Sequence, residues 1–368
     1  MKRIACMMAM ACLGLSAFAQ QDSTTWKRFT LGSEVQAQQE AAKTEYIPVT
    51  QYWKEHNIFQ HLDVSLTAGT TGIGIDVASP IGDYVQVRAG YEFMPRFSKR
   101  MAFDLTINGQ PANIYDEHGY KQESTFTQMN DFLYEFTGYD ADDHADMIGK
   151  PTINNFKFLV DVFPFKNNKH WHFTAGFYWG PSRVAYAENA IESMRTLTAV
   201  GIYNNMYEKA VNDEPLISYE YKGRTYTVDV PQEFYKKMKE TGRLGFSVGY
   251  FKHDIVDFYG EQHKAGERYI VEPNGDGMVT VTAKTNSFKP YLGFGYGGRM
   301  IKNRDDWHVS FDCGAMFWGG TPSLYMHDGI SLTDDVDNIS GQVGKYVDFI
   351  KGLKVFPVLS LRITKRIF

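Results

Sequence analysis

The clearest alternation of apolar and polar positions in this sequence lies between Trp307 and Trp318. From Trp307 to Phe317, a stretch of 11 residues, every second residue is apolar, and the residues between them are polar or small: His308, Ser310, Asp312 and Gly314. Side chains of a β-strand alternate between its two faces, so this pattern predicts a strand with one apolar and one polar face. The length suffices to cross a bilayer at a tilt, and the aromatic ends are typical of transmembrane barrel strands. We expect Trp307 near one membrane interface and Phe317 and Trp318 near the other.

The same alternation recurs along the chain, which predicts a sheet of many such strands. It is found near residues 62–68, 73–77, 85–93, 156–163, 173–179, 244–250, 292–296 and 355–363. The apolar positions change phase within Gly69-Thr70-Thr71-Gly72. A phase change would turn the apolar face inward, so this tetrapeptide is either a tight turn between two strands or a bulge in one long strand. We favour the turn.

The connections between the predicted strands are sharply unequal in length. Short ones lie near 79–83, 166–169 and 302–306, and long ones near 98–153, 187–241 and 319–352. Short periplasmic turns and long extracellular loops are typical of outer-membrane barrels. By this rule the strands near 243–251 and 290–299 both run inward, so a further strand must lie between them, within 268–284. We therefore predict an all-β fold, a transmembrane antiparallel β-barrel of about ten strands, with eight to twelve left open and both ends periplasmic.

The long loops contain predicted structure of their own. Residues 216–230 indicate a hairpin about Lys222-Gly223, followed by a helix from Pro231 to Glu240 with proline at its first position. The stretch from Ala190 to Ala210 is compatible with another helix. Ordered loops of this kind would restrict the barrel mouth and offer a contact surface.

The N-terminus predicts export from the cytoplasm. Residues 1–19 contain Lys2-Arg3, an apolar run and the small-x-small sequence Ala17-Phe18-Ala19, as in a cleaved signal peptide. Cys12 allows a lipoprotein signal as an alternative, but that cleavage would leave an apolar core of only eight residues, Ile4 to Ala11. We expect residues 20–57 to form an N-terminal arm and residues 58–368 to form the barrel with its loops. After the signal peptide, no apolar run approaches the roughly 20 residues that a membrane helix needs.

Composition and charge narrow the class further. Aromatic residues are 15% of the chain, with 23 Tyr, 26 Phe and 33 Gly, a profile that suits a barrel with a polar lumen. The net charge is -5, and it becomes -7 once Lys2 and Arg3 leave with the signal peptide, which argues against nucleic acid as a partner. Two of the three cysteines lie in the signal peptide, so Cys313 alone remains and no intrachain disulfide is expected.

These patterns resemble the outer-membrane β-barrel family of gram-negative bacteria, broadly similar to outer-membrane proteins A and W. The resemblance rests on Gly72–Tyr91, on Phe288–Gly298 and on the closing strand, which ends in Phe368. It implies an outer-membrane location, contact with outer-membrane lipid, and a last strand that the barrel-insertion machinery reads during assembly. The pattern departs from the family where Lys365-Arg366-Ile367 shifts the terminal aromatic by one residue from the apolar face.

The polar faces of the predicted strands define a set of charged side chains in the lumen. Both signs occur on neighbouring strands, which in a narrow barrel predicts a filled, ion-paired interior rather than the single-sign ring of a wide selective pore. The predicted lumen network is Arg88, Glu92, Lys157, Asp161, His172, Arg243, His308, Asp312 and Arg362.

Candidates for catalysis and for metal binding are weaker. Gly245-Phe-Ser247-Val-Gly249 matches the nucleophile motif G-x-S-x-G, but it lies in an alternating strand, where Ser247 would face the lumen. Asp312 or Asp161 together with a lumen histidine resembles the histidine–aspartate pair of a hydrolytic site. No nucleophile lies in register with such a pair. An acidic stretch lacks the glycine of a calcium loop, so these residues are only weak candidates for a metal site: Asp140, Asp142, Asp143 and Asp146.

The sequence thus predicts an outer-membrane barrel with a largely plugged lumen and a structural or surface-interaction role. A narrow porin-like channel for small solutes is the alternative, and a lipid-processing barrel enzyme, a hydrolase or acyltransferase, is the second alternative. We expect no enzymatic activity and no cofactor, and the sequence identifies no surface ligand.

Overall fold

A computed structural model describes residues 49–56, 58–107, 110–111, 114–124, 126–127, 130–131, 134–135, 138–165, 168–339 and 341–367. Residues from Trp53 onward belong to one compact unit. The predicted signal peptide, residues 1–19, and the terminal Phe368 lie outside the described residues. Of the predicted N-terminal arm, residues 20–57, the structure describes residues 49–56, which include the helix α3 (Val49–Glu55).

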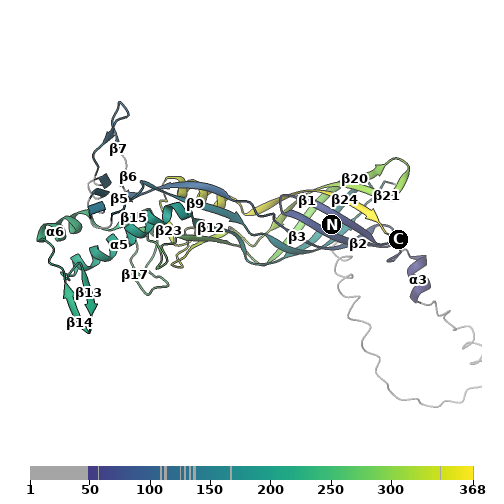
Figure 1. Ribbon diagram of the computed structural model, residues 1–368. Coiled ribbons are helices and arrows are strands. Elements are labelled where there is room, and N and C mark those ends of the chain that lie inside the picture. The colour runs from purple at the N-terminus through teal and green to yellow at the C-terminus, as the bar shows by residue number, and fades with distance from the viewer. Residues whose placement is uncertain are drawn as a thin grey trace, which may run out of the picture. The chain divides into compact units, whose positions relative to one another are not determined.

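Eight antiparallel strands close into a barrel (Figure 1). Strand β1 pairs with β2 on one side and with β24 on the other, so the sheet has no free edge. The barrel strands are β1 (Asp63–Gly69), β2 (Gly72–Ile81), β3 (Val85–Phe93), β10 (Asn154–Val162), β11 (Trp171–Trp179), β20 (Phe288–Ile301), β21 (Arg304–Phe317) and β24 (Val355–Arg366).

The expectation of about ten barrel strands is wrong, because two of the predicted strands lie outside the barrel. Strand β15 (Leu244–Phe251) pairs with β18 (Arg268–Val271) in one sheet outside the barrel, and β19 (Thr280–Lys284) belongs to another. An amphipathic strand shows the same alternation whether its apolar face meets lipid or the core of a folded domain. If β15 is taken as a barrel strand, the rule that short turns lie at the periplasmic end makes β15 and β20 run in the same direction. One further barrel strand is then required between them.

The predicted turn at Gly69–Gly72 is confirmed. Gly69 pairs with Gly72 across a hairpin that joins β1 to β2. Gly72 has a φ of 118°, a backbone conformation that side chains other than glycine rarely adopt. The turns 82–84 and 302–303, and the ends of β10 and β11 that adjoin each other in the chain, lie at the same end of the barrel as the start of β1 and the end of β24; the long connections lie at the other end.

Five barrel strands continue into a second sheet beyond the barrel. Its order, β22-β19-β12-β9-β4, repeats the order of the barrel strands β21-β20-β11-β10-β3 that adjoin them in the chain. Backbone bonds bridge the junction, from Met94 N to Ile153 O (2.8 Å) and from Thr152 N to Val184 O (2.9 Å). The second sheet consists of β4 (Lys99–Asp104), β9 (His144–Pro151), β12 (Arg183–Asn189), β19 (Thr280–Lys284) and β22 (Ser323–Met326).

A third sheet and several helices complete what we call the outer domain, the described residues within 94–153, 180–287 and 318–354. The sheet contains β5 (Thr106–Ile107), β6 (Gln110–Pro111), β15 and β18, with β23 (Val336–Asp337) paired to β15. Three hairpins add β7 (Ile114–Tyr115) with β8 (Lys121–Gln122), β13 (Ser218–Tyr221) with β14 (Arg224–Thr227), and β16 (Ile255–Val256) with β17 (Gln262–His263). The helices are the 3-10 turn η1 (Ile191–Ser193), α5 (Met194–Val211), α6 (Gln232–Thr241) and α7 (Gly341–Gly352).

The predictions made for residues 190–240 are confirmed. The helix expected near 190–210 is η1 with α5, the hairpin about Lys222-Gly223 is β13–β14, and the helix expected from Pro231 is α6, with Pro231 as its N-cap. No described helix has both the length and the apolar character to cross a membrane.

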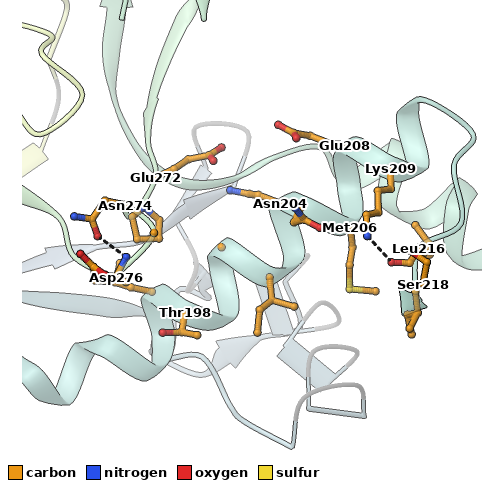
Figure 2. Close-up of a pocket in the computed structure, with 18 residues that line it drawn as sticks. Thr198, Asn204, Met206, Glu208, Lys209, Leu216, Ser218, Glu272, Asn274 and Asp276 are labelled. Carbon is orange, nitrogen blue, oxygen red and sulfur yellow. Dashed lines mark hydrogen bonds between the residues drawn. The ribbon is translucent and has the colours of Figure 1, made fainter. Parts of the chain in front are cut away.

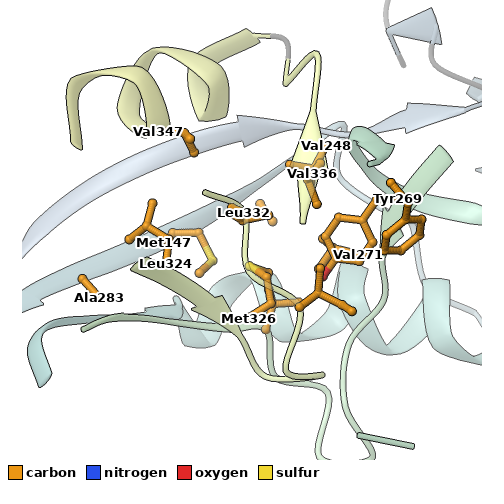
Figure 3. Packing of buried hydrophobic residues seen from close by; sticks show 14 of the residues in the cluster. Met147, Val248, Tyr269, Val271, Ala283, Leu324, Met326, Leu332, Val336 and Val347 are labelled. Atoms are coloured by element: carbon orange, nitrogen blue, oxygen red, sulfur yellow. The ribbon is translucent and has the colours of Figure 1, made fainter. Parts of the chain in front are cut away.

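The outer domain has its own apolar core. Val248 and Val271, from the third sheet, pack with Met147 and Leu324 of the second sheet and with Val347 of α7 (Figure 3). These side chains are buried. The extended loops are therefore a folded domain rather than a set of separate connections.

Candidate functional site in the barrel interior

The two faces of each barrel strand differ as the sequence pattern predicts. On β21, Phe311 is 51% exposed on the outer surface of the barrel, and the next residue, Asp312, is 3% exposed inside it. Aromatic side chains meet on the outer surface near both ends: Trp171 lies 4.9 Å from Tyr296, and Phe177 lies 5.1 Å from Phe288, measured between ring centroids. An exposed apolar band with aromatic ends is typical of a barrel that faces lipid.

Trp318 follows this arrangement on the inner face and corrects our expectation that it lies at the outer interface. The side chain is buried, and its Nε1 donates a hydrogen bond to the carbonyl of Leu353 (2.8 Å). Trp318 continues the even-numbered positions of β21, on which Asp312 and Met316 are buried, so alternation points the indole inward, into the apolar cluster with Met316. The indole N–H thus finds a backbone acceptor within the protein.

Asp161 is the centre of a buried network of charges in the barrel interior. Arg88 Nη2 lies 3.0 Å from Asp161 Oδ1, and Arg362 Nη1 lies 3.3 Å from Asp161 Oδ2. Thr174 Oγ1 donates a further hydrogen bond to Asp161 (2.7 Å). The three charged side chains come from β3, β10 and β24, so the contacts span the lumen from different walls.

His172 and Asp312 extend this network. His172 Nε2 lies 2.6 Å from Asp312 Oδ1, and Arg362 Nε lies 3.5 Å from Asp312 Oδ2. Arg362 Nε also donates to Ser310 Oγ (2.9 Å). The neighbour of the histidine–aspartate pair is therefore the guanidinium group of Arg362, which compensates the charge of Asp312.

A second group of buried charges lies on the side of the barrel formed by β2, β3 and β10. Lys157 Nζ lies 2.8 Å from Asp76 Oδ1 and also pairs with Glu92. All three side chains are at most 3% exposed. Arg88 Nη1 lies 3.8 Å from Asp76 Oδ2, which links this group to the network around Asp161.

Glycines on the inner face make room for these side chains. A Cβ at Gly295 would collide with Asp312 and His172, and a Cβ at Gly90 would collide with the carboxylate of Asp76. The glycine-rich sequence near 293–298, which superficially resembles a dinucleotide motif, thus lies in a strand whose inner face holds the charge network.

An apolar cluster fills the lumen near the end with the long connections. Leu159, Tyr178 and Tyr291 pack there with Met316 and Val358. The rings of Tyr178 and Tyr291 meet edge to face, 5.5 Å apart. Together with the charges, this cluster occupies the barrel interior with side chains from seven of the eight strands.

A cavity of about 380 Å³ lies at the end with the short turns. His61, His170 and His308 line it together with Arg299 and Arg366. This inner mouth is polar and narrows onto Arg362 and His172, which belong both to its lining and to the charge network. His308, which the sequence places in the lumen network, thus lies at the mouth.

Arg243 does not belong to the lumen, which corrects its inclusion in the predicted network. It lies beside β15 in the outer domain, 3.3 Å from Glu261 and 3.6 Å from Glu272, and it also pairs with Glu208. This error and the wrong strand count have the same cause. The alternation of β15 resembles that of a barrel strand, and it therefore predicts that Arg243 faces the lumen. Ser247 lies in β15 as well and therefore outside the lumen.

The acidic residues proposed as a weak metal site have separate partners. Asp143 Oδ1 lies 2.6 Å from His144 Nδ1, and this hydrogen bond raises the pKa of His144. Asp146 Oδ2 pairs with Arg100 (3.2 Å), and Asp142 accepts from Thr196 (3.4 Å). Among the described residues these carboxylates, with Asp140, do not form a group that converges on one point.

Two buried lumen residues were missed by the sequence reasoning. Asp76 is fully buried between Lys157 and Arg88, and Lys289 donates hydrogen bonds to Asn155 Oδ1 (3.3 Å) and to the carbonyl of Ser287 (3.4 Å). The sequence contains a signal, the strand alternation, that places each of these two residues. Asp76 lies between apolar Ile75 and Val77, and Lys289 follows Phe288, so strand alternation alone places both inside.

The outer domain contains a larger cavity, of about 740 Å³, beside α5. Figure 2 shows its lining, in which Asn204 and Glu208 of α5 face the segment that carries Glu272 and Asn274. Asn274 Oδ1 accepts hydrogen bonds from the amides of Asp276 (3.0 Å) and Met278 (2.9 Å), which shapes this segment as a tight turn.

The fold defines a class: a closed eight-stranded antiparallel β-barrel with a folded domain built on one end. Comparison with protein-family models gives no match, and comparison with curated proteins gives none. Among solved structures, the chain is similar to CarO2 and CarO of Acinetobacter baumannii, at 12% and 13% identity. Both have a TM-score of 0.34, with 83% of this chain and 98% and 97% of theirs covered. Similarity at this level transfers no residue role and no activity.

Proposed function

We propose that this chain is an outer-membrane β-barrel with a lumen closed by its own side chains, and that it serves a structural or surface-interaction role through its outer domain. The observation that carries the proposal is that side chains fill the lumen beyond the cavity at the inner mouth. The charge network around Asp161 and the apolar cluster around Tyr291 lie in series along the barrel axis.

The membrane assignment is supported by the outer surface of the barrel. Exposed apolar side chains occupy alternate positions on its strands, among them Leu66, Ile75, Phe173, Leu292 and Phe311. Exposure of such an apolar surface is unfavourable in water and favourable in lipid. The closed sheet also leaves no edge strand unpaired, as a lipid environment requires. Assembly by the barrel-insertion machinery belongs to the same proposal.

The closed lumen is supported by the energetics of the charge network. Asp161, Arg88 and Arg362 are buried, and each is held by opposite charge. Removing one partner of a buried pair typically costs about 3–5 kcal/mol, because the remaining charge is left without compensation. An ion crossing this layer would have to displace such pairs, so we expect the resting barrel to conduct poorly.

The surface role is supported by the hairpin β13–β14. Tyr219 and Tyr226 stack across the two strands with centroids 5.5 Å apart, and Tyr221 and Arg224 form the next pair on the same face. All of these side chains are exposed. Exposed tyrosines beside an arginine are typical of surfaces that bind other molecules.

Planar-bilayer recording tests the closed lumen. The purified full-length protein, folded in detergent, should give no stable conductance steps under conditions in which a reference porin does. Stable, voltage-resolved steps that require the protein would overturn the closed lumen and favour the narrow channel. Correct folding is checked first by the heat-dependent mobility of the barrel in detergent gels, so that silence cannot come from unfolded protein.

A further inference from the structure

Three side chains with metal-binding groups converge at the tip of the hairpin β16–β17 in the outer domain. One ligand atom from each of Asp257, Glu261 and His263 lies within 4.8 Å of the others. Asp257 and Glu261 begin and end the turn between the two strands, and His263 belongs to β17. No part of the proposed membrane barrel is involved.

Two of these three groups are held in place before any ion binds. Asp257 Oδ1 accepts hydrogen bonds from the amides of Tyr259 (2.9 Å) and Glu261 (2.8 Å), so the other oxygen, Oδ2, is directed toward His263. The ring of His263 stacks on Phe251 with centroids 4.6 Å apart and 18° between the planes. Phe251 is itself buried in the core of the outer domain, so the imidazole rests on a rigid surface.

The separation of these atoms fits two ligands of one ion better than a direct hydrogen bond. His263 Nε2 lies 3.7 Å from Asp257 Oδ2, which is the longest of five histidine–aspartate separations among the described residues; the other four run from 2.6 to 3.5 Å. Two ligand atoms about 2.1 Å from a tetrahedral zinc ion lie about 3.4 Å apart. A small closure of the turn would therefore complete the geometry.

The surrounding charge favours a cation. Glu261 also pairs with Arg243 (3.3 Å), but Arg243 has Glu208 and Glu272 as further partners. Glu261 can therefore turn toward an ion while Arg243 keeps its other contacts. Asp328 adds negative charge close to the turn. Its carbonyl accepts a hydrogen bond from the amide of Phe258, within the turn (2.8 Å), and its carboxylate accepts one from the Tyr269 hydroxyl (2.6 Å).

We propose that Asp257, Glu261 and His263 bind a divalent transition-metal ion, with Zn²⁺ the best match. One imidazole nitrogen and two carboxylate oxygens suit zinc, whereas calcium and magnesium prefer ligand sets made of oxygen alone. Water completes the coordination on the exposed side, where Glu261 lies. Binding would fix the turn of the hairpin against the core of the outer domain.

Calorimetric titration with ZnCl₂ tests the site on the full-length protein in detergent, produced without a histidine tag. Because His61, His170 and His308 line the inner mouth of the barrel and could bind zinc as well, the measured quantity is the difference between variants. The wild-type protein should bind one more equivalent of Zn²⁺ than His263→Gln, and Glu261→Gln should weaken that site about tenfold or more. Co²⁺ in place of Zn²⁺ should give visible absorption bands that His263→Gln lacks.

His253→Gln is the matched control. His253 lies in the same domain, exposed and 3.2 Å from Asp335, but without a third ligand among the described residues, so this variant should titrate like the wild type. Identical titrations of wild type and His263→Gln would overturn the proposal. Equal loss in His253→Gln and His263→Gln, or Ca²⁺ binding as tight as that of Zn²⁺, would overturn it too. Circular dichroism of each variant shows whether the fold is intact.

Discussion

At the scale of single residues, the barrel interior depends on groups that neutralise one another and on the absence of side chains beside them. Arg88 and Arg362 share the two oxygens of Asp161, and Asp312 is shared by Arg362 and His172. The charges fit because Gly295 leaves the space that His172 and Asp312 occupy. Removing one of these charges would therefore leave several neighbouring groups without a compensating partner.

Asp161→Asn should strongly destabilise the folded barrel, because both arginines lose the charge that compensates them. We expect a loss of about 3–5 kcal/mol in the free energy of unfolding. Urea unfolding in detergent micelles, followed by tryptophan fluorescence, measures it. Asp305→Asn is the control, since its pair with Arg299 is exposed and should contribute less than about 1 kcal/mol. Equal effects of the two substitutions would mean that the buried network does not stabilise the barrel.

At the scale of elements, strands with a similar alternation of apolar and polar residues lie in two different environments. Strand β21 alternates because one face meets the lumen and the other the exterior, whereas β15 lies within the outer domain, where it pairs with β18 and contacts α5. The second sheet continues the barrel strands in the same order, so its hydrogen bonding does not depend on the hairpins that project from the outer domain. The hairpin β13–β14 is the clearest case of such a projection.

Replacing residues 219–226 by Asn-Gly should leave both the barrel and the outer domain folded. The hairpin strands are exposed along their whole length, and a backbone bond from Val228 N to Ile217 O (3.0 Å) already brings the cut ends together. Heat-dependent gel mobility and trypsin resistance should match the wild type. Loss of either one would show that the hairpin contributes to folding and not only to the surface.

At the scale of the whole molecule, the topology places the two ends of the barrel in different surroundings. Both the start of β1 and the end of β24 lie at the end with the short turns, and Ile367 N donates to Leu62 O there (2.8 Å). The long connections leave from the opposite end and form the outer domain. In the proposed membrane orientation, the first end faces the periplasm and the second faces the medium.

An epitope inserted after Gly223, at the tip of β13–β14, should be labelled by antibody on intact gram-negative cells. The same epitope inserted after Asn303, in the turn between β20 and β21, should be labelled only after the outer membrane is permeabilised. Both sites are exposed turns, so the comparison isolates the side of the membrane. Labelling of the Asn303 insertion on intact cells would reverse the orientation, and labelling of neither would argue against a surface location.

Much of the barrel could be predicted from the sequence because a strand has a fixed period of two. The alternation about Trp307–Phe317 identified β21, and the phase change at Gly69–Gly72 identified the hairpin of β1 and β2, as the pairing confirms. The same parity places Asp161, His172, Asp312 and Arg362 on the inner face. Alternation does not depend on distant contacts, so local sequence was sufficient for these assignments.

What only the tertiary structure decided is which amphipathic strands close the barrel and which charges meet. Strand β15 and Arg243 have the same local pattern as their barrel counterparts, yet they pack in the outer domain, because an apolar face is satisfied equally by lipid or by a protein core. The partners of Asp161 come from strands far apart in the sequence and depend on the closure of the sheet. The sequence by itself thus determined the faces of the strand between Trp307 and Phe317, and closure into eight strands determined what its Asp312 touches.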